Sequence, residues 1–516
     1  MAGIVINEDN SHYFSDRGKD GADEESLCGL ARHYCVGQVV EVCYNFNAQR
    51  VNVSGMPCEP VWAGTEDRGA EGVFFRGRRL SPDSADWIRG ARSLDEKGID
   101  PYAVWLSETR RLGRRASLSM RMNDVHCVND PDNFMHCAFW REHPEYRIDP
   151  VSGDPAWFVA ELDYARPEVR SYALDLIRSV LERYDCDGLE LDWMRFGHHL
   201  AHGRLEEGRT LLTGFHREVR KLADIAEKRL KHPVEVTARV PADPVAAWDM
   251  GYDVAAWVHE GLVAGVVPTA FWATTDTAMP IGFWRRLLGD KVRIDAGLEL
   301  LVRPYPASQP VLDRPGFLAA QAADCLYQGA DRIYLFNHMD SGTCMPDIAA
   351  YYRLLNAAGT LQTVSAQPRR HVLTYRDTRP FGEPVGGVLP QRLSGEKPFS
   401  EPLRIEVGPK PEPGRSCRVI LGFDTAQPLP VEVRLNNVKL SLLRSGPPPE
   451  QEEDLPAAFR QAGKRNLTRP FPESTASLAE FEADGLAAAG ANIITVRLTG
   501  SAEGQITWAE ISVAGA

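Results

Sequence analysis

The sequence predicts an α/β protein, a (β/α)8 TIM barrel followed by a C-terminal antiparallel β-sandwich. Up to about residue 360, apolar strand-like runs alternate with segments of helical periodicity, as is typical of a β/α protein. After about residue 365 the helical periodicity disappears, prolines cluster and short alternating strands take over. We therefore predict a barrel domain at residues 1–362 and a sandwich domain at residues 363–516.

The first domain contains eight apolar runs, which is the number of strands that a closed parallel barrel needs. They are Ile4–Asn7, Val39–Asn45, Ser117–Asn123, Gly188–Asp192, Val234–Arg239, Val263–Thr269, Val292–Leu300 and Arg332–Asn337. Between them, apolar residues at helical spacing predict helices at Pro101–Leu112, Pro167–Tyr184, Leu211–Arg229, Val254–Glu260, Gly282–Leu288, Gly316–Gln328 and Asp347–Ala358. The stretches 48–95 and 124–165 are rich in Gly, Pro and Asp and are expected to be long loops at strand ends, where such barrels build their pockets.

The second domain is predicted from short runs in which apolar and polar residues alternate. These runs are Leu403–Val407, Arg418–Gly422, Val431–Leu435, Asn492–Leu498 and Gln505–Val513. Two roles are equally expected for this domain: binding carbohydrate, or packing against the barrel to close one wall of its site. Residues Pro447–Pro470 are predicted to form an extended loop within it.

The composition narrows the classes of partner. With 58 basic and 71 acidic residues the net charge is −13, which argues against a nucleic-acid or anionic-membrane partner and makes a neutral substrate easier to accommodate. No leader segment is visible and no apolar stretch approaches about 18 residues, so we expect a cytoplasmic protein, unless a signal has been trimmed. The ten cysteines are scattered, as expected for buried free thiols in a reducing compartment. No cofactor is expected, and a homo-oligomer is left open.

Two acids at the end of the fourth predicted strand are the strongest indication of function. Glu190 and Asp192 are separated by one residue, so their side chains face the same side of the strand. Neighbouring carboxylates near apolar side chains have raised pKa values, as a general acid at neutral pH requires, and Arg195 could keep one of them ionised. The alternative is a structural salt bridge between Arg195 and one acid. A structural pair needs only one acid, whereas this strand offers two.

The other predicted strand ends are also polar, and such ends meet at one mouth of a barrel. Amides and acids bind vicinal hydroxyl groups, and aromatic rings stack on a sugar, so these residues are predicted to bind a carbohydrate. Each one alone could be a satisfied strand-end group. The three arginines could recognise an acidic sugar, although fixing the catalytic acids is the favoured role. The predicted substrate-binding residues are Asn7, Asp9, Asn45, Arg121, Asn123, Asp124, His126, Trp193, Arg195, Arg239, Trp272, Asn337 and His338.

The segments 162–170 and 184–196 carry a family resemblance. The first reads Leu-Asp-Tyr-Ala-Arg-Pro-Glu-Val-Arg and the second Tyr-Asp-Cys-Asp-Gly-Leu-Glu-Leu-Asp-Trp-Met-Arg-Phe. Together they resemble the fourth β/α unit of the glycoside-hydrolase-like TIM-barrel proteins of the family 10-like type. The segment 121–124 and the Asn7/Asp9 strand end also fit this group. The resemblance implies a retaining or inverting glycosidase whose main acid, on the fourth strand, corresponds to Asp192.

We therefore predict a glycoside hydrolase in which Asp192 or Glu190 is the acid/base. Glu299 is the predicted partner, because a pair of acids on strands four and seven resembles the large retaining clan of TIM-barrel glycosidases, although the Asn-Glu dipeptide of that clan is absent from strand four. Asp124 is the substitute if Glu299 points outward. A carboxyl separation of about 5–5.5 Å would predict retention of configuration, and about 6.5–9.5 Å inversion.

Three alternatives stay open. The first is a barrel that binds carbohydrate without catalysis. The second is a metal-dependent enzyme, for which Asp124, His126 and His136 with Glu190 or Asp192 could supply ligands. The third is a lyase acting on a uronic polysaccharide, suggested by the three nearby arginines.

Overall fold

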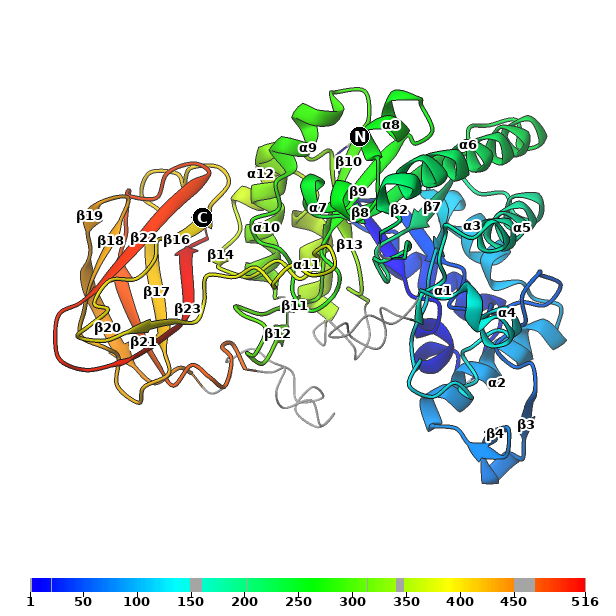
Figure 1. Cartoon of the computed structure of the whole chain (residues 1–516), viewed down its shortest axis with the longest axis horizontal. Helices are drawn as coiled ribbons and strands as arrows, with labels where there is room; N and C mark the ends of the chain where they lie inside the picture. The colour runs from blue at the N-terminus through cyan, green and yellow to red at the C-terminus, as the bar shows by residue number, and fades with distance from the viewer. Residues whose placement is uncertain are drawn as a thin grey trace.

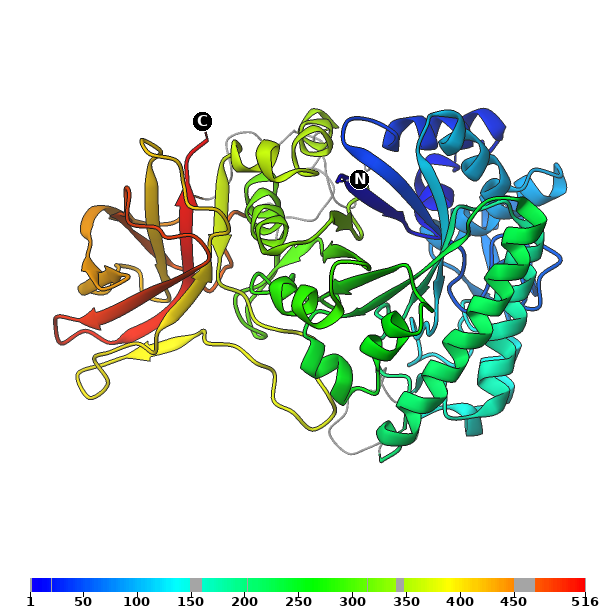
Figure 2. The ribbon, with the colours of Figure 1, turned by 90° about the horizontal axis from the view of Figure 1, so that it is seen from above.

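The computed structural model describes residues 2–19, 21–148, 160–201, 203–312, 314–339, 348–449 and 469–515. It confirms the predicted barrel, because eight parallel strands close into a ring in the order β1-β13-β10-β9-β8-β7-β6-β2. Figures 1 and 2 show this barrel, coloured blue to green, beside the sheet domain in yellow to red. The strands are β1 (Ile4–Glu8), β2 (Val39–Asn45), β6 (Arg115–Arg121), β7 (Gly188–Asp192), β8 (Glu235–Pro241), β9 (Gly265–Thr269), β10 (Arg293–Leu298) and β13 (Arg332–Leu335).

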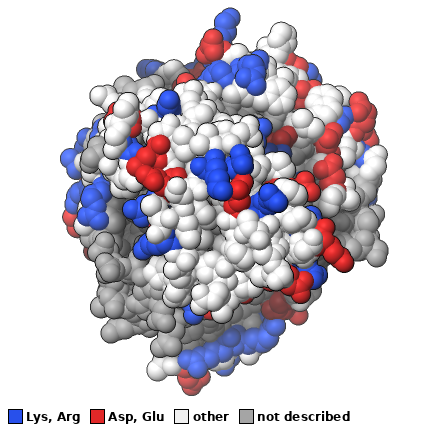
Figure 3. Space-filling model, turned by 90° about the vertical axis from the view of Figure 1, so that its left-hand side faces the viewer, with Lys and Arg blue, Asp and Glu red and all other residues white. Residues whose placement is uncertain are grey.

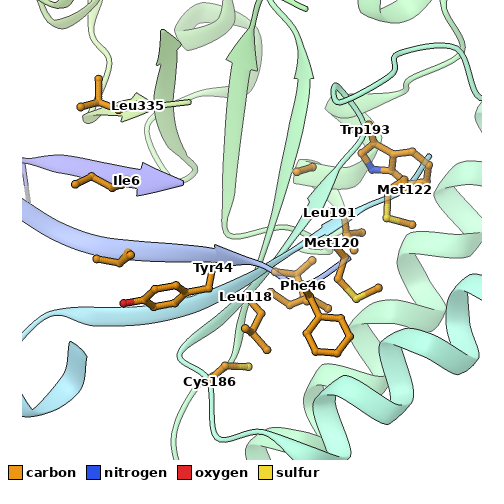
Figure 4. Packing of buried hydrophobic residues seen from close by; sticks show 14 of the residues in the cluster. Ile6, Tyr44, Phe46, Leu118, Met120, Met122, Cys186, Leu191, Trp193 and Leu335 are labelled. Carbon is orange, nitrogen blue, oxygen red and sulfur yellow. The ribbon is translucent and has the colours of Figure 1, made fainter. Parts of the chain in front are cut away.

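Each strand is buried on both faces, which is why its sequence reads as a nearly continuous apolar run. The outward-facing side chains join one large apolar core with the surrounding helices; Ile6, Leu118, Leu191 and Leu335 belong to it (Figure 4). A smaller cluster fills the inside of the ring and joins residues of strands on opposite sides of it: Val5, Cys43, Val267, Tyr334 and Phe336.

The predicted helices are present around the barrel. They are α3 (Pro101–Arg111), α5 (Pro167–Arg183), α6 (Leu205–Leu230), α8 (Val254–His259), α9 (Ile281–Leu288), α10 (Pro315–Gln328) and α11 (Ile348–Ala357). Helix α6 begins at Leu205 rather than Leu211. The chain also forms helices that were not predicted: α1 (Glu24–Tyr34), α2 (Pro82–Glu96), α4 (Ala138–Glu142), α7 (Pro244–Asp249) and α12 (Leu361–Ser365).

The stretch 48–95 was predicted to be a long loop, and this prediction is wrong where helix α2 forms. The Ser81 side chain accepts a hydrogen bond from the Ser84 N–H, and Pro82 occupies the first turn, so the helix start has a cap and a favourable first residue. Trp87 and Leu94 on its inner face are buried. The same stretch contains a small antiparallel sheet of β3 (Thr65–Asp67), β4 (Val73–Phe75) and β5 (Arg78–Arg79).

The C-terminal region confirms the predicted antiparallel sheets. One sheet has the order β14-β23-β17-β21-β20, with β15 on β23, and the other has the order β16-β22-β18-β19. Alternate side chains of both sheets form a common apolar core. The first sheet contains β14 (Arg369–Val372), β15 (Gln391–Leu393), β17 (Cys417–Phe423), β20 (Ser441–Gly446), β21 (Ser477–Glu482) and β23 (Gly504–Val513). The second contains β16 (Leu403–Glu406), β18 (Val431–Leu435), β19 (Val438–Lys439) and β22 (Ala491–Leu498).

Two predictions for this region stay untested. Residues 450–468 of the predicted loop Pro447–Pro470 lie outside the described residues. The domain boundary at 362/363 also stays a prediction.

On the end of the molecule seen in Figure 3, side chains of both charges are interspersed over the visible face rather than gathered into one basic field.

The barrel and the sheet domain share an apolar contact. Phe317 on α10 packs in one cluster with Trp508 of β23 and Phe471. The guanidinium carbon of Arg370 lies over the Phe317 ring, 4.2 Å from its centroid. Arg370 in turn binds both carboxyl oxygens of Glu510 at 2.7 Å. The sheet domain is therefore packed against the barrel by buried residues of both.

Two further features bear on the sequence predictions. None of the described helices has the length and apolar character needed to cross a lipid bilayer. The nine cysteines within the described ranges are all free thiols, and six of them are buried, as predicted.

Candidate active site

The end of β7 places the two predicted acids inside the barrel. Leu189 and Leu191 belong to the outer core, so Glu190 and Asp192 between and beyond them face inward. In the register of the neighbouring strands, Ser119 lies opposite Glu190, and Asp192 lies between Arg121 on β6 and Arg239 on β8. Pleat and register together therefore bring two acids and two arginines to one end of the barrel.

Glu190 is held from two sides of the ring. One of its carboxyl oxygens accepts hydrogen bonds of 2.7 Å from the Ser119 hydroxyl and the Tyr334 hydroxyl. Burial, followed by the negative charge of Asp192, raises the pKa of Glu190 to about 7. Its second oxygen accepts no hydrogen bond from the described residues. With a pKa of about 7, this carboxyl group exchanges a proton near neutral pH.

Asp192 is surrounded by donors. One oxygen accepts the backbone N–H groups of Met194 and Arg195 at 2.9 Å, and the Arg239 guanidinium approaches both oxygens at 3.0 and 3.1 Å. The side chain is fully buried. Since every contact is a donor and one is a cation, the ionised form of Asp192 is the form this environment fits.

Glu299 follows β10 and shares the same arginine. Its carboxyl oxygen lies 3.2 Å from Nη2 of Arg239, while Nη1 serves Asp192, and Asn337 donates to its other oxygen at 3.5 Å. Burial raises the pKa of Glu299 to about 8 in spite of Arg239 and Arg195. Glu299 therefore points into the site, and Asp124 is not needed as its substitute.

A second chain of polar contacts borders this group. Arg121 binds Asp9 and, at 2.9 Å, Asp124, and the other oxygen of Asp124 lies 2.8 Å from Nδ1 of His126. Burial alone would raise the pKa of Asp9 and of Asp124, but their neighbours, Arg121 above all for Asp9 and the contact with His126 followed by Arg121 for Asp124, lower both well below the usual range. Both acids are therefore ionised counter-charges.

The arginines have different roles from those expected. Among the residues that the structure describes, no acid pairs with Arg195; its guanidinium lies 2.7 Å from Nε2 of His126. Arg239 instead makes the salt bridge to Asp192. Of the three arginines, only Arg239 contacts predicted catalytic acids, whereas Arg121 binds Asp9 and Asp124.

The remaining predicted binding residues divide into two groups. Asn7 and Asn45 are buried at strand ends, each with one amide atom that has no hydrogen-bond partner within the described residues, and Trp272 is 45% exposed. Asn337, in the left-handed backbone region, contacts Glu299, and burial lowers the pKa of His338 to about 4, so its ring is neutral. All five could meet a ligand.

Trp193 and Asn123 are placed elsewhere. The Trp193 ring is fully buried on the helix side of the barrel (Figure 4), where its Nε1 donates to His216 at 3.2 Å. Asn123 donates to the Leu162 carbonyl and accepts the Leu162 N–H, and it also contacts His199. Trp193 therefore cannot stack on a sugar at the mouth, and the amide of Asn123 is used in anchoring a loop.

Sequence reasoning missed three residues that contact or act on the acids, and one further buried acid. Ser119 and Tyr334 hold Glu190, and register with a predicted strand could have identified Ser119. Asp377, which follows β14, accepts the backbone N–H groups of residues 271–273 at 2.9–3.0 Å beyond the end of β9. Glu161 is a fully buried acid whose pKa burial raises well above its usual range. No local pattern marks Asp377 or Glu161.

The proposed metal ligands are not assembled. Nε2 of His136 faces the Cys127 carbonyl at 3.2 Å, and both ring nitrogens of His126 are occupied by Asp124 and Arg195. Within the described ranges, no three His, Cys, Asp or Glu side chains are grouped as metal ligands.

Comparisons with known proteins give only distant likenesses. No protein-family model matches the chain, and no curated protein sequence matches it. Among solved structures, it resembles α-L-fucosidase isoenzyme 2 from Paenibacillus thiaminolyticus, with 13% identity over 71% of this chain and 50% of that chain and a TM-score of 0.42. The PgaB (BpsB) glycoside hydrolase domain from Bordetella bronchiseptica gives 12% identity, coverages of 70% and 99%, and a TM-score of 0.41. A family GH18 chitinase from Chromobacterium violaceum gives 8% identity over 99% of this chain and 88% of that chain, with a TM-score of 0.37.

These values are too low to transfer an activity or a family to this chain. The family 10-like assignment is therefore not confirmed.

Proposed function

We propose that the protein is a glycoside hydrolase in which Glu299 is the general acid and Asp192 the ionised carboxylate. The observation that carries the proposal is the position of Arg239, whose two terminal nitrogens contact Asp192 at 3.0 Å and Glu299 at 3.2 Å. Glycoside hydrolysis needs one protonated and one ionised carboxyl group on either side of the scissile bond. A pKa of about 8 keeps Glu299 protonated at neutral pH, while the donors around Asp192 favour its charge.

The reaction then follows from the charges. Glu299 gives its proton to the glycosidic oxygen, the bond from that oxygen to the anomeric carbon breaks, and Asp192 stabilises the positive charge that develops on the sugar. The Glu299 carboxylate formed in this step remains beside Arg239, which offsets its new negative charge. In a retaining reaction Asp192 bonds to the anomeric carbon, and water activated by Glu299 then releases the sugar.

Glu190 adjusts the charge of the site. Burial, followed by the charge of Asp192 two residues away, raises the pKa of Glu190 to about 7, so this carboxyl group exchanges a proton near neutral pH. Ser119 and Tyr334 fix the position of that proton-bearing group. We assign Glu190 to positioning and charge control, while the bond-breaking proton comes from Glu299.

The experiment is hydrolysis of a panel of aryl glycosides and natural oligosaccharides by wild type, Asp192→Asn, Glu299→Gln and Glu190→Gln. Circular dichroism checks that each variant is folded. We expect folded Asp192→Asn to lose about 10²-fold or more in kcat/KM on both kinds of substrate, and folded Glu299→Gln to lose as much on the oligosaccharides. The surface variant Asp175→Asn, which changes a half-exposed ion pair with Arg178, is the matched control and should retain wild-type activity. If a broad panel gives no turnover, or if activity survives both changes, the protein is not this hydrolase and a carbohydrate-binding barrel becomes the better account.

A further inference from the structure

Three arginines reach the site, and two of them are fully matched by acids. Arg121 is paired with Asp9 and Asp124, and Arg239 with Asp192 and Glu299. Each of these guanidinium groups therefore has its counter-charge inside the protein, as buried arginines require.

Arg195 is the exception. Within the described part of the chain, no carboxylate lies within ion-pair distance of its guanidinium, whose hydrogen bond from Nη2 goes to Nε2 of His126 at 2.7 Å. A guanidinium can only donate, so His126 must accept at Nε2 and carry its proton on Nδ1, which faces Asp124. His126 therefore supplies an acceptor to Arg195 but no negative charge.

The surroundings of Arg195 are partly apolar. Its carbon CZ lies 5.5 Å from the ring centroid of Phe196 and 5.7 Å from that of Phe336, and its Nε is buried without a hydrogen-bond partner in the described residues. Burial, followed by the nearby charge of Arg121, lowers the pKa of this guanidinium, although Asp9, Asp124 and Glu299 act in the opposite direction from beyond ion-pair distance. The residue is nevertheless partly exposed, so a ligand can reach it.

A carboxylate is the ligand that best completes these contacts. Its two oxygens match the planar fork of a guanidinium and would supply the direct charge partner that Arg195 lacks among the described residues. Arg195 is also tied to the catalytic group directly, because its backbone N–H binds Asp192 at 2.9 Å. A sugar held at Asp192 therefore places its substituents close to this side chain.

We propose that Arg195 binds the carboxylate of a uronic acid unit, so that the substrate is an acidic glycan rather than the neutral one that the net charge of the chain favours. This inference rests on the proposed glycosidase function and names its substrate class. The net charge of −13 describes the whole surface, whereas Arg195 sets the local charge at the mouth.

The test compares aryl uronides with the corresponding neutral aryl hexosides, using wild type, Arg195→Gln, Arg195→Lys and Arg209→Gln. The last is a matched control, because Arg209 also lies over an aromatic ring, 4.1 Å from the centroid of Trp248, but is paired with Glu206. We expect wild type to prefer uronides, and Arg195→Gln to reduce the uronide-to-hexoside ratio of kcat/KM by about 10-fold or more. Arg195→Lys should restore part of that ratio, and Arg209→Gln should leave it unchanged.

The outcomes separate this inference from the glycosidase proposal. Equal turnover of uronides and hexosides, with a ratio unaffected by Arg195→Gln, would overturn the role of Arg195 and leave the hydrolase intact. If no glycoside is hydrolysed, calorimetric titration with oligouronides decides: binding that Arg195→Gln abolishes supports the anion site and removes the hydrolase, and absence of binding removes both. An unsaturated uronate product would replace the hydrolase by a lyase and retain the role of Arg195.

Discussion

Tyr334 on β13 donates a hydrogen bond of 2.7 Å to Glu190 on β7, and these two strands lie on opposite sides of the eight-stranded ring. The bond therefore crosses the inside of the barrel. It fixes the depth at which Glu190 sits beneath Asp192, and it lowers a pKa that burial and the charge of Asp192 raise.

Replacing Tyr334 by Phe tests this relationship. The hydroxyl stabilises the ionised form of Glu190, so its removal is expected to raise the pKa of Glu190 above about 7. The titration can be followed from the carboxyl band in infrared difference spectra of wild type and variant, with Glu190→Gln identifying the band. Tyr305→Phe, which removes a hydroxyl that donates to Ser474 at 2.7 Å in another part of the molecule, should not move it. An unchanged titration in Tyr334→Phe would show that the cross-barrel bond does not act on Glu190.

The raised pKa of Glu299 predicts a dependence of stability on pH. Its pKa is about 8 in the folded protein and 4.5 as the ordinary value, so the folded state holds the proton more tightly. The free energy of unfolding should therefore be highest below about pH 4.5 for this group, fall as the pH rises towards about 8 and then level off. Glu299→Gln removes the contribution of this group to the pH dependence. Between about pH 5 and pH 8, the free energy of unfolding in urea should therefore fall less in the variant than in wild type. Glu503→Gln, at an exposed pair with Arg392, is the control; an equal loss in Glu299→Gln and wild type would contradict the assignment.

Arg121 is expected to be essential for stability. Arg121→Gln leaves the partly buried Asp9 and the buried Asp124 without their shared cation, so we expect a loss of about 3–5 kcal/mol in the free energy of unfolding. Arg178→Gln, at an exposed pair with Asp175, should cost less than about 1 kcal/mol. Chemical denaturation of both variants measures the difference, and comparable losses would mean that the buried pairs contribute little.

Asp377 connects the segment after β14 with the barrel mouth. Its carboxylate accepts three consecutive backbone N–H groups, including that of Trp272, and Asp377→Ala removes all three acceptor contacts. We expect KM for oligosaccharides to rise by about 10-fold, because the half-exposed Trp272 loses its fixed position at the site. Asp424→Ala, which removes an acceptor for the Gln505 N–H within the sheet domain, is the matched control and should leave KM unchanged. Equal KM values for the two variants would mean that the C-terminal region does not shape the site.

The stereochemical outcome is a further prediction. Two carboxyl groups that bind neighbouring nitrogens of one guanidinium are close together, which favours the separation of about 5–5.5 Å found in retaining enzymes. NMR of the first product formed should therefore show the same anomer as the substrate. Release of the opposite anomer would exclude Asp192 as a nucleophile and assign it to the activation of water.

The strands and their polar ends could be predicted from sequence because strand periodicity is local. Glu190 and Asp192 point inward as their spacing predicted, and Glu299 joins them from a strand predicted seventh in the chain. Register across the ring is not local, so nothing in the run containing Tyr334 indicated that its hydroxyl reaches Glu190. Trp193 is a different case. A residue that follows an inward-facing acid faces the helices by alternation, which is a local pattern, but the aromatic side chain alone suggested a sugar platform.

The most direct test of the central claim is the effect of leaving group on Glu299→Gln. A dinitrophenyl glycoside needs no protonation of its leaving oxygen, whereas an oligosaccharide does, so loss of the general acid should impair only the second reaction strongly. We predict that Glu299→Gln retains most of its kcat/KM for the dinitrophenyl glycoside and loses about 10²-fold or more for the oligosaccharide, while Asp192→Asn loses activity towards both. Equal losses on both substrates in Glu299→Gln, or full activity of Asp192→Asn, would contradict the assignment of acid and carboxylate around Arg239.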